Sequence, residues 1–190
     1  MPTCGSAECN SPDGIHGRSE CPLLAGQLKR VEPFVSDLSK CCQIYQVVAP
    51  LRLMLVRASD PAACRTLDRL VCHYDRRRQM AMYERMDQNV VAIMKQLLRV
   101  EQFDTEAIRT ACGILDTNTY EVRISGRSKM RALYPTVALM NHNCRPNTRH
   151  SFDQQMNMSV WAITDIAPGE AISATYTQSL WPTSTRWGLS

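Results

Sequence analysis

The spacing of the apolar residues changes near residue 116, and this change limits the folds that the chain can adopt. Before it, apolar residues recur at intervals of three and four, as expected for amphipathic helices. After it, apolar and polar residues alternate over short runs bounded by turn residues, as expected for strands. The sequence therefore predicts an α+β fold in which helices come first and a small β region follows.

The helical part carries several start and stop signals. A helix is expected from about residue 34, and Pro50 should kink or end it. Asp60-Pro61 has the form of a helix start, because an acceptor side chain precedes proline at the first helical position. Asp104 is a second such start. The expected apolar stripes are Leu67, Leu70, Val71 and Tyr74, then Val90, Ile93, Met94 and Leu97, then Ile108, Ala111, Cys112 and Leu115.

Three short strands are expected in the second part. The first carries Tyr120, Val122 and Ile124 and ends at the Ser125-Gly126 turn. The second runs through Met156, Met158 and Val160, and the third carries Ile172, Ala174 and Tyr176 after the turn at Pro168-Gly169.

Composition excludes several classes of protein. The hydrophobic content of 44% and charged content of 21% are those of globular proteins. A net charge of +4 is too small to predict a dedicated nucleic-acid-binding protein, and the run Arg76 to Arg78 is expected on a solvated helix face. No apolar stretch reaches the roughly 18–20 residues of a membrane span, and the start lacks a signal-peptide core. We therefore expect a protein of the nucleus and/or cytoplasm, without membrane contact.

The nine cysteines are expected to be metal ligands or buried apolar groups, because thiols stay reduced inside the cell. Cys4, Cys9, His16 and Cys21 crowd a start rich in Gly, Ser and Pro. Three thiols and one imidazole suit zinc, although the spacing is looser than in ordinary zinc fingers. The alternative is that these cysteines hold no metal.

A polar segment, Asn-His-Asn-Cys-Arg-Pro-Asn, occupies residues 141–147. Its amides and imidazole could contact a ligand, and Pro146 restricts the backbone around them. By itself the segment could equally be a surface turn. A nucleophilic pair of Cys144 and His142 is a further alternative.

A second segment, residues 167–176, reads Ala-Pro-Gly-Glu-Ala-Ile-Ser-Ala-Thr-Tyr. It predicts a turn followed by a strand that ends at Tyr176. Taken alone, that tyrosine is most simply an aromatic side chain of the core or its rim.

Together the two segments resemble, in order and spacing, the two C-terminal motifs of the SET domain. The run Leu133 to Thr136, and Cys112 to Leu115 with Asn118, extend the resemblance to SET-and-MYND (SMYD-type) lysine methyltransferases. The segment Tyr176 to Trp181 resembles the insect SmydA group. The resemblance covers about residues 4–187.

The resemblance implies a protein that binds S-adenosylmethionine and transfers its methyl group to a lysine of a histone or another protein. Asn118, Asn141 and His142 would contact the cofactor, and Tyr176 would be the catalytic aromatic hydroxyl beside the transferred methyl group. Methyl transfer is an in-line displacement, so a narrow site that orients the amine would supply much of the rate.

The same resemblance assigns a partial MYND-type zinc finger to residues 1–26, with Cys4, Cys9, His16 and Cys21 as ligands. Each ligand spacing is one residue longer than the family pattern. Residues 27–115 would be the helical insert of a SET domain, residues 116–182 the C-terminal half of the SET β fold, and residues 183–190 a divergent tail.

Three departures from the family concern activity. The 190 residues contain no Gly-x-Gly segment, no first pair of MYND cysteines and no cysteine cluster after Trp181 that could join Cys144. We therefore expect a chain shortened at both ends, with negligible methyl transfer by itself. The rival interpretation is a non-catalytic MYND/SET interaction module acting in transcriptional repression. The sequence does not indicate an oligomeric state.

Overall fold

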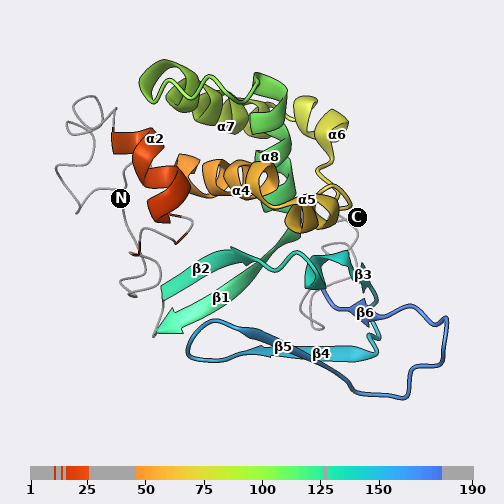
Figure 1. Ribbon diagram of the computed structural model, residues 1–190. Helices are drawn as coiled ribbons and strands as arrows, with labels where there is room; N and C mark the ends of the chain where they lie inside the picture. Colours follow the sequence, from red (N-terminus) through yellow and green to blue (C-terminus); the bar gives the residue numbers. More distant parts are fainter. Residues whose placement is uncertain (1–10, 12–13, 15, 26–45, 126–127, 177–190) are drawn as a thin grey trace. The chain divides into compact units, whose positions relative to one another are not determined.

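The computed structural model describes residues 11, 14, 16–25, 46–125 and 128–176 (Figure 1). The chain divides into two compact units, residues 1–118 and 119–190. Helices make up the described part of the first unit, and small sheets dominate the second. The predicted α+β class is therefore confirmed.

The first unit is built around α8, which packs against α4 and α7. Leu51 of α4 and Ile108 of α8 are fully buried, and Met94 is buried with them. The helical elements are η1 (His16–Glu20), α2 (Cys21–Ala25), α4 (Val48–Ser59), α5 (Pro61–Leu67), α6 (Tyr74–Arg78), α7 (Ala81–Ala92), η3 (Ile93–Leu97) and α8 (Thr105–Asn118).

Both predicted helix starts are confirmed. The Asp60 carboxylate accepts hydrogen bonds from the backbone N–H groups of Ala62 and Ala63, at 2.8 and 3.1 Å. The Asp104 carboxylate accepts from the Ala107 N–H at 2.7 Å. These side chains satisfy donors that have no partner within the helix.

Pro50 was predicted to kink or end a helix, but the helix in which it lies does not end there. It lies in the first turn of α4, which continues to Ser59. A proline is tolerated there because its missing N–H would have had no helical acceptor. Residues 34–45, where that helix was expected to begin, lie outside the described residues.

The predicted stripe from Leu67 to Tyr74 is also wrong. The helix α5 ends at Leu67 and α6 begins at Tyr74, so the residues between them follow no helical period. Val71 is 55% exposed.

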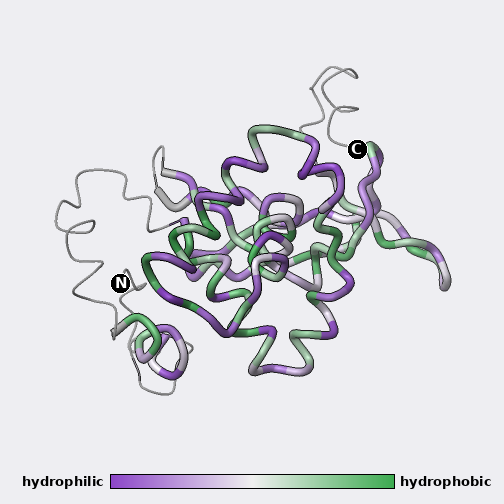
Figure 2. The backbone as a smooth tube through the Cα atoms, turned by 90° about the horizontal axis from the view of Figure 1, so that it is seen from above, coloured by the Kyte–Doolittle hydropathy of each residue, from purple (hydrophilic) through white to green (hydrophobic). Residues whose placement is uncertain are grey.

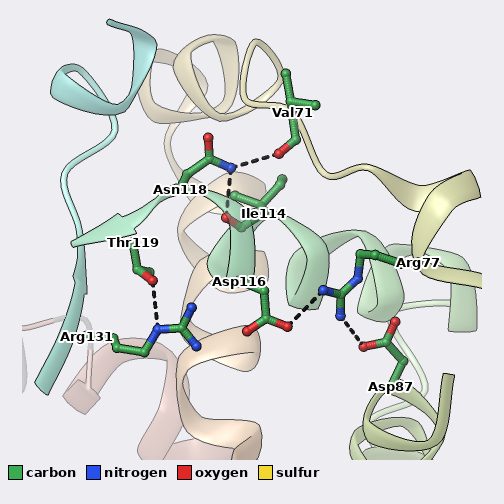
Figure 3. Close-up of polar contacts among 8 residues, drawn as sticks. All are labelled: Val71, Arg77, Asp87, Ile114, Asp116, Asn118, Thr119 and Arg131. Carbon is green, nitrogen blue, oxygen red and sulfur yellow. Dashed lines mark hydrogen bonds and ion pairs between the residues drawn. The ribbon is translucent and has the colours of Figure 1, made fainter. Parts of the chain in front are cut away.

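The basic run does not lie wholly on a solvated face, because the Arg77 side chain is buried (Figure 3). Its guanidinium donates to Asp116 Oδ2 at 2.9 Å and to Asp87 Oδ1 at 2.7 Å. It also lies 4.4 Å from the centre of the Tyr83 ring. A buried charge is stable only when it is paired, and here two carboxylates pair it.

The described residues of the second unit form three two-stranded sheets. β1 (Thr119–Ser125) and β2 (Ser128–Leu133) form an antiparallel hairpin, and so do β4 (Thr148–Phe152) and β5 (Met158–Ala162). The short β3 (Asn141–His142) pairs in parallel with β6 (Ser173–Ala174), and η4 (Val137–Leu139) precedes β3.

The predicted strands are confirmed in part. Strands exist where expected in β1, β5 and β6, but β2, β3 and β4 were not predicted. Met156 does not belong to a strand, because its φ of 64° is left-handed and places it in the turn before β5.

Figure 2 shows hydrophobic and hydrophilic stretches interleaved along the chain. Among the described residues, no helix is both long enough and apolar enough to cross a bilayer.

Gly113 should be intolerant of any side chain. A Cβ there would lie 2.5 Å from the Cys72 carbonyl oxygen and 3.0 Å from the Cys72 Cβ. We predict that Gly113→Ala destabilises the chain by roughly 1–3 kcal/mol, although alanine is the better helix former. Urea denaturation measures the effect, with the exposed Thr117→Ala on the same helix as control. A Gly113→Ala chain as stable as the original would show that the backbones separate easily.

Cys112 should make stability depend on alkaline pH. Burial, reinforced by the Asp87 and Asp116 carboxylates, raises the pKa of its thiol to about 12 from an ordinary 9.0. From about pH 9 to about pH 12 the unfolded chain therefore loses this proton first, and the free energy of unfolding falls. We predict that Cys112→Ala flattens this decline in urea denaturation, whereas Cys64→Ala leaves it. An equal decline in both variants would contradict the assignment.

Candidate active site

The two SET-like segments meet through β3 and β6. Asn141 pairs with Ser173 and His142 pairs with Ala174, in parallel register. The Asn143 N–H continues the pairing by donating to the Ala174 carbonyl at 3.0 Å. The Asn-His segment is therefore a short strand that pairs with a segment about thirty residues later, and the surface-turn interpretation does not hold for its first residues.

Asn147 connects the same two segments through its buried side chain. Its Oδ1 accepts from the Ser173 N–H at 2.8 Å, and its amide donates to the Ala171 carbonyl at 2.9 Å and to Glu170 Oε1 at 3.3 Å. Thr148 Oγ1 adds a bond to the Ser173 carbonyl at 2.7 Å. A buried amide is stable only when its donors and acceptor are satisfied, so this residue specifies how the segments pair. Sequence reasoning assigned it no role, although it closes the Asn-His segment.

His142 and Tyr176 contact each other directly. The backbone N–H of Tyr176 donates to His142 Nδ1 at 3.0 Å, and the two ring centres lie 5.4 Å apart. The Tyr176 hydroxyl donates to the Met140 carbonyl. Asn141, His142 and Tyr176, three of the predicted site residues, therefore lie together, and all three are exposed.

These bonds also determine which nitrogen of His142 is protonated. Because Nδ1 accepts a hydrogen bond, the neutral ring carries its proton on Nε2. Nε2 lies 3.4 Å from Cys144 Sγ, so its N–H faces the sulfur. A general base would need an unprotonated nitrogen there. The geometry therefore argues against the nucleophilic pair of Cys144 and His142.

A cluster of aromatic rings, which we call the aromatic cluster, lies on β1, on β4 and just after β2 in the same unit. Its ring centres are 5.5–6.1 Å apart. Its members are Tyr120, Tyr134, His150 and Phe152. Sequence reasoning used Tyr120 only as a strand marker and did not predict the cluster. His150 and Phe152 share one face of β4, a period-two signal that could have revealed half of it.

The ionisable rings near this cluster are held uncharged. Burial, with a smaller repulsion from Tyr176, raises the pKa of Tyr120 to about 12. Burial also raises the pKa of Tyr176 and lowers that of His150. At neutral pH the site therefore offers protonated phenols rather than phenolates.

Asn118, the remaining predicted cofactor residue, ends α8 in the first unit. Its side-chain amide donates to the carbonyls of Val71 and Ile114, each at 2.8 Å (Figure 3). The residue thus joins the end of α8 to the segment after α5. Its cofactor role stays a prediction.

Of the four predicted zinc ligands, Cys4 and Cys9 lie outside the described residues. His16 lies in η1, where its Nδ1 is 3.0 Å from Glu20 Oε2, and the Cys21 thiol is exposed and free. In the part of the chain that the structure describes, no group of three or more His, Cys, Asp or Glu converges as metal ligands do. The donors fit zinc chemically, because imidazole nitrogen and thiolate sulfur are its preferred ligands and His16 keeps one ring nitrogen for it.

Comparison with known proteins extends this picture. The family model for the SET domain matches residues 41–177. The chain is 42% identical over 77 residues to the SET domain-containing protein SmydA-8, isoform A, of Drosophila melanogaster, covering 39% of this chain and 17% of that protein. It is 28% identical over 159 residues to isoform B, covering 76% of this chain and 35% of the relative.

A vertebrate relative is the N-lysine methyltransferase SMYD2-B of Danio rerio, 33% identical over 84 residues, which are 44% of this chain and 19% of that protein. The chain thus spans 17% to 35% of the length of these relatives. Because the family model covers most of the chain, this protein belongs to the SET-domain family. Its relatives confirm the predicted resemblance to SET-and-MYND (SMYD-type) members.

Asn147 should be needed to hold the site together. We predict that Asn147→Ala destabilises the chain by roughly 1–3 kcal/mol, because it leaves buried partners on the second segment unsatisfied. Asn157→Ala, which loses an exposed bond to Asp153, should cost far less. Urea denaturation followed by tryptophan fluorescence compares the two, and equal losses would show that the Asn147 contacts add nothing specific.

Proposed function

We propose that this site serves protein-lysine N-methylation with S-adenosylmethionine as methyl donor. The observation that carries the proposal is the parallel pairing of β3 with β6, which puts Asn141 and His142 beside Tyr176 in a chain of the SET-domain family. The acceptor would be a lysine of a histone or another protein, met in the nucleus and/or cytoplasm.

In this proposal Asn141 and His142 hold the cofactor, which supplies a methyl group on a positively charged sulfur. The His142 ring is already oriented, because the Tyr176 N–H donates to its Nδ1 and Cys144 Sγ contacts its Nε2. Fixed donors and acceptors lower the entropy that a ligand must lose when it is aligned.

Tyr176 would act by orientation and not as a base. Its pKa is raised by burial, so the hydroxyl keeps its proton, which it donates to the Met140 carbonyl. The phenol oxygen can then accept a hydrogen bond from a lysine amine. The aromatic faces of the cluster would favour the ammonium group that methylation of a neutral lysine amine leaves on the side chain, because aromatic faces attract ammonium groups.

We further propose that the N-terminal segment is a partial MYND-type finger that binds zinc through Cys4, Cys9, His16 and Cys21. Two observations support this proposal: the donor types suit zinc, and among the described residues only Nδ1 of the His16 ring has a partner.

Cofactor binding is tested by titrating S-adenosylmethionine into the ¹⁵N-labelled chain. We predict shifts in the backbone amides of residues 141–143 and 176, with affinity weak because the 190 residues contain no Gly-x-Gly segment. His142→Ala should lower the affinity about tenfold or more, since it removes a ring of the site and leaves the Tyr176 N–H without its acceptor, which costs about 1–3 kcal/mol. The exposed His73→Ala is the matched control.

Catalysis is tested by radiolabel transfer to lysine-rich protein, which detects slow turnover. We predict that, in a chain to which a Gly-x-Gly segment has been restored, Tyr176→Phe lowers kcat roughly 10- to 100-fold with little change in KM, because orientation is lost and binding is kept. Tyr74→Phe in α6 is the control. A folded chain that, with this segment restored, neither binds the cofactor nor transfers label would overturn the proposal and favour the interaction module in transcriptional repression.

A further inference from the structure

Glu20 is a fully buried carboxylate at the end of η1. Arg52 of α4 donates to it twice, from Nε to Oε1 and from Nη2 to Oε2, the second bond being 2.9 Å. His16 Nδ1 lies 3.0 Å from Oε2. Burial of a carboxylate is costly unless its oxygens are paired, and in this unit an arginine and a histidine pair them.

The carboxylate determines the tautomer of His16. A carboxylate can only accept, so Nδ1 must donate, and the neutral ring then has an unprotonated Nε2. In the described part of the chain this bond is the one that the imidazole makes. The His16 side chain is only 14% exposed, so the ring is held in place. Its Nε2 lone pair can bind a metal.

From this geometry we infer that Glu20 is a positioning residue for a zinc-binding His16, which ligates through Nε2. The inference rests on the zinc binding proposed above and adds residues to it. Metal-binding histidines commonly donate their second ring N–H to a carboxylate, which orients the ring and raises its basicity as a ligand. Here the carboxylate is also anchored to the helical unit through Arg52.

This anchorage couples the metal to α4. Arg52 follows Leu51, which is fully buried in the core of the first unit. Zinc that binds the folded chain in preference to the unfolded one stabilises the elements that the site is linked to, which here include α4. Zinc should therefore slow hydrogen exchange at the backbone amides of α4 as well as ordering its own ligands.

Zinc affinity is measured on the whole chain by competition with a chromophoric chelator. Glu20→Gln, which keeps the shape of the side chain and removes its charge, should lower the zinc affinity about 10- to 100-fold. Glu106→Gln, an exposed glutamate at the start of α8, should change nothing. His16→Ala and Cys21→Ser remove proposed ligands. Each should lower the zinc affinity at least as much as Glu20→Gln does.

The imidazole tautomer gives a readout that a merely structural role would not move. Nitrogen NMR of the metal-free chain should show His16 protonated on Nδ1, and Glu20→Gln should shift the ring toward the other tautomer. Arg52→Met keeps the bond between Glu20 and His16, so it tests the inference even where Glu20→Gln fails to fold. The Arg52→Met chain should keep the His16 tautomer and lower the zinc affinity less than about tenfold. Zinc should no longer slow hydrogen exchange at the backbone amides of α4 in this variant.

The outcomes separate this inference from the zinc proposal beneath it. If His16→Ala weakens zinc while a folded Glu20→Gln chain binds as tightly as the original, Glu20 does not position the ligand and the inference is wrong. A His16 ring protonated on Nε2 in the metal-free chain would also overturn it. A chain that binds no zinc, or binds it equally without His16 and Cys21, would overturn both.

Discussion

The bonds of the Asn147 side chain are the constraint on which the candidate site depends. They join the turn before β4 to the segment that leads into β6, where the Ser173 N–H donates to Asn147 Oδ1 and the Ser173 carbonyl accepts from Thr148 Oγ1. The β3–β6 ladder itself is only two residues long, too short to hold its register alone. With the amide satisfied and buried, alternative registers would leave polar groups unpaired, so the pairing is specific.

The chemistry of the site follows from that pairing. Once β6 lies beside β3, the backbone of Tyr176 reaches His142 and its hydroxyl reaches the Met140 carbonyl. Backbone contacts, rather than neighbouring charges, thus set the tautomer of the histidine and the direction of the phenol. The same contacts argue against a thiol nucleophile at Cys144, because the nitrogen that faces the sulfur carries the proton.

In the helical unit, buried ion pairs connect helices that are connected by few apolar contacts. Arg77 joins α6 to α7 and α8 through two aspartates, and Glu20 joins η1 to α4 through Arg52. Removing one partner of such a pair leaves a buried charge uncompensated, which is far more costly than losing an exposed salt bridge. These pairs therefore connect short helices that have little apolar surface of their own.

The sequence alone determined the α+β class, the helix starts at Asp60 and Asp104, and the two SET-like segments, because caps and periodicity are local and the two segments keep their order and spacing along the chain. It could not show that Arg77 is buried or that an aromatic cluster surrounds Tyr120. Those depend on partners far away in the chain: Arg77 meets carboxylates from two other helices, and Tyr120 meets the rings of Tyr134 and His150. Long-range packing alone decides such contacts, since no local pattern specifies which distant side chain will satisfy a given group.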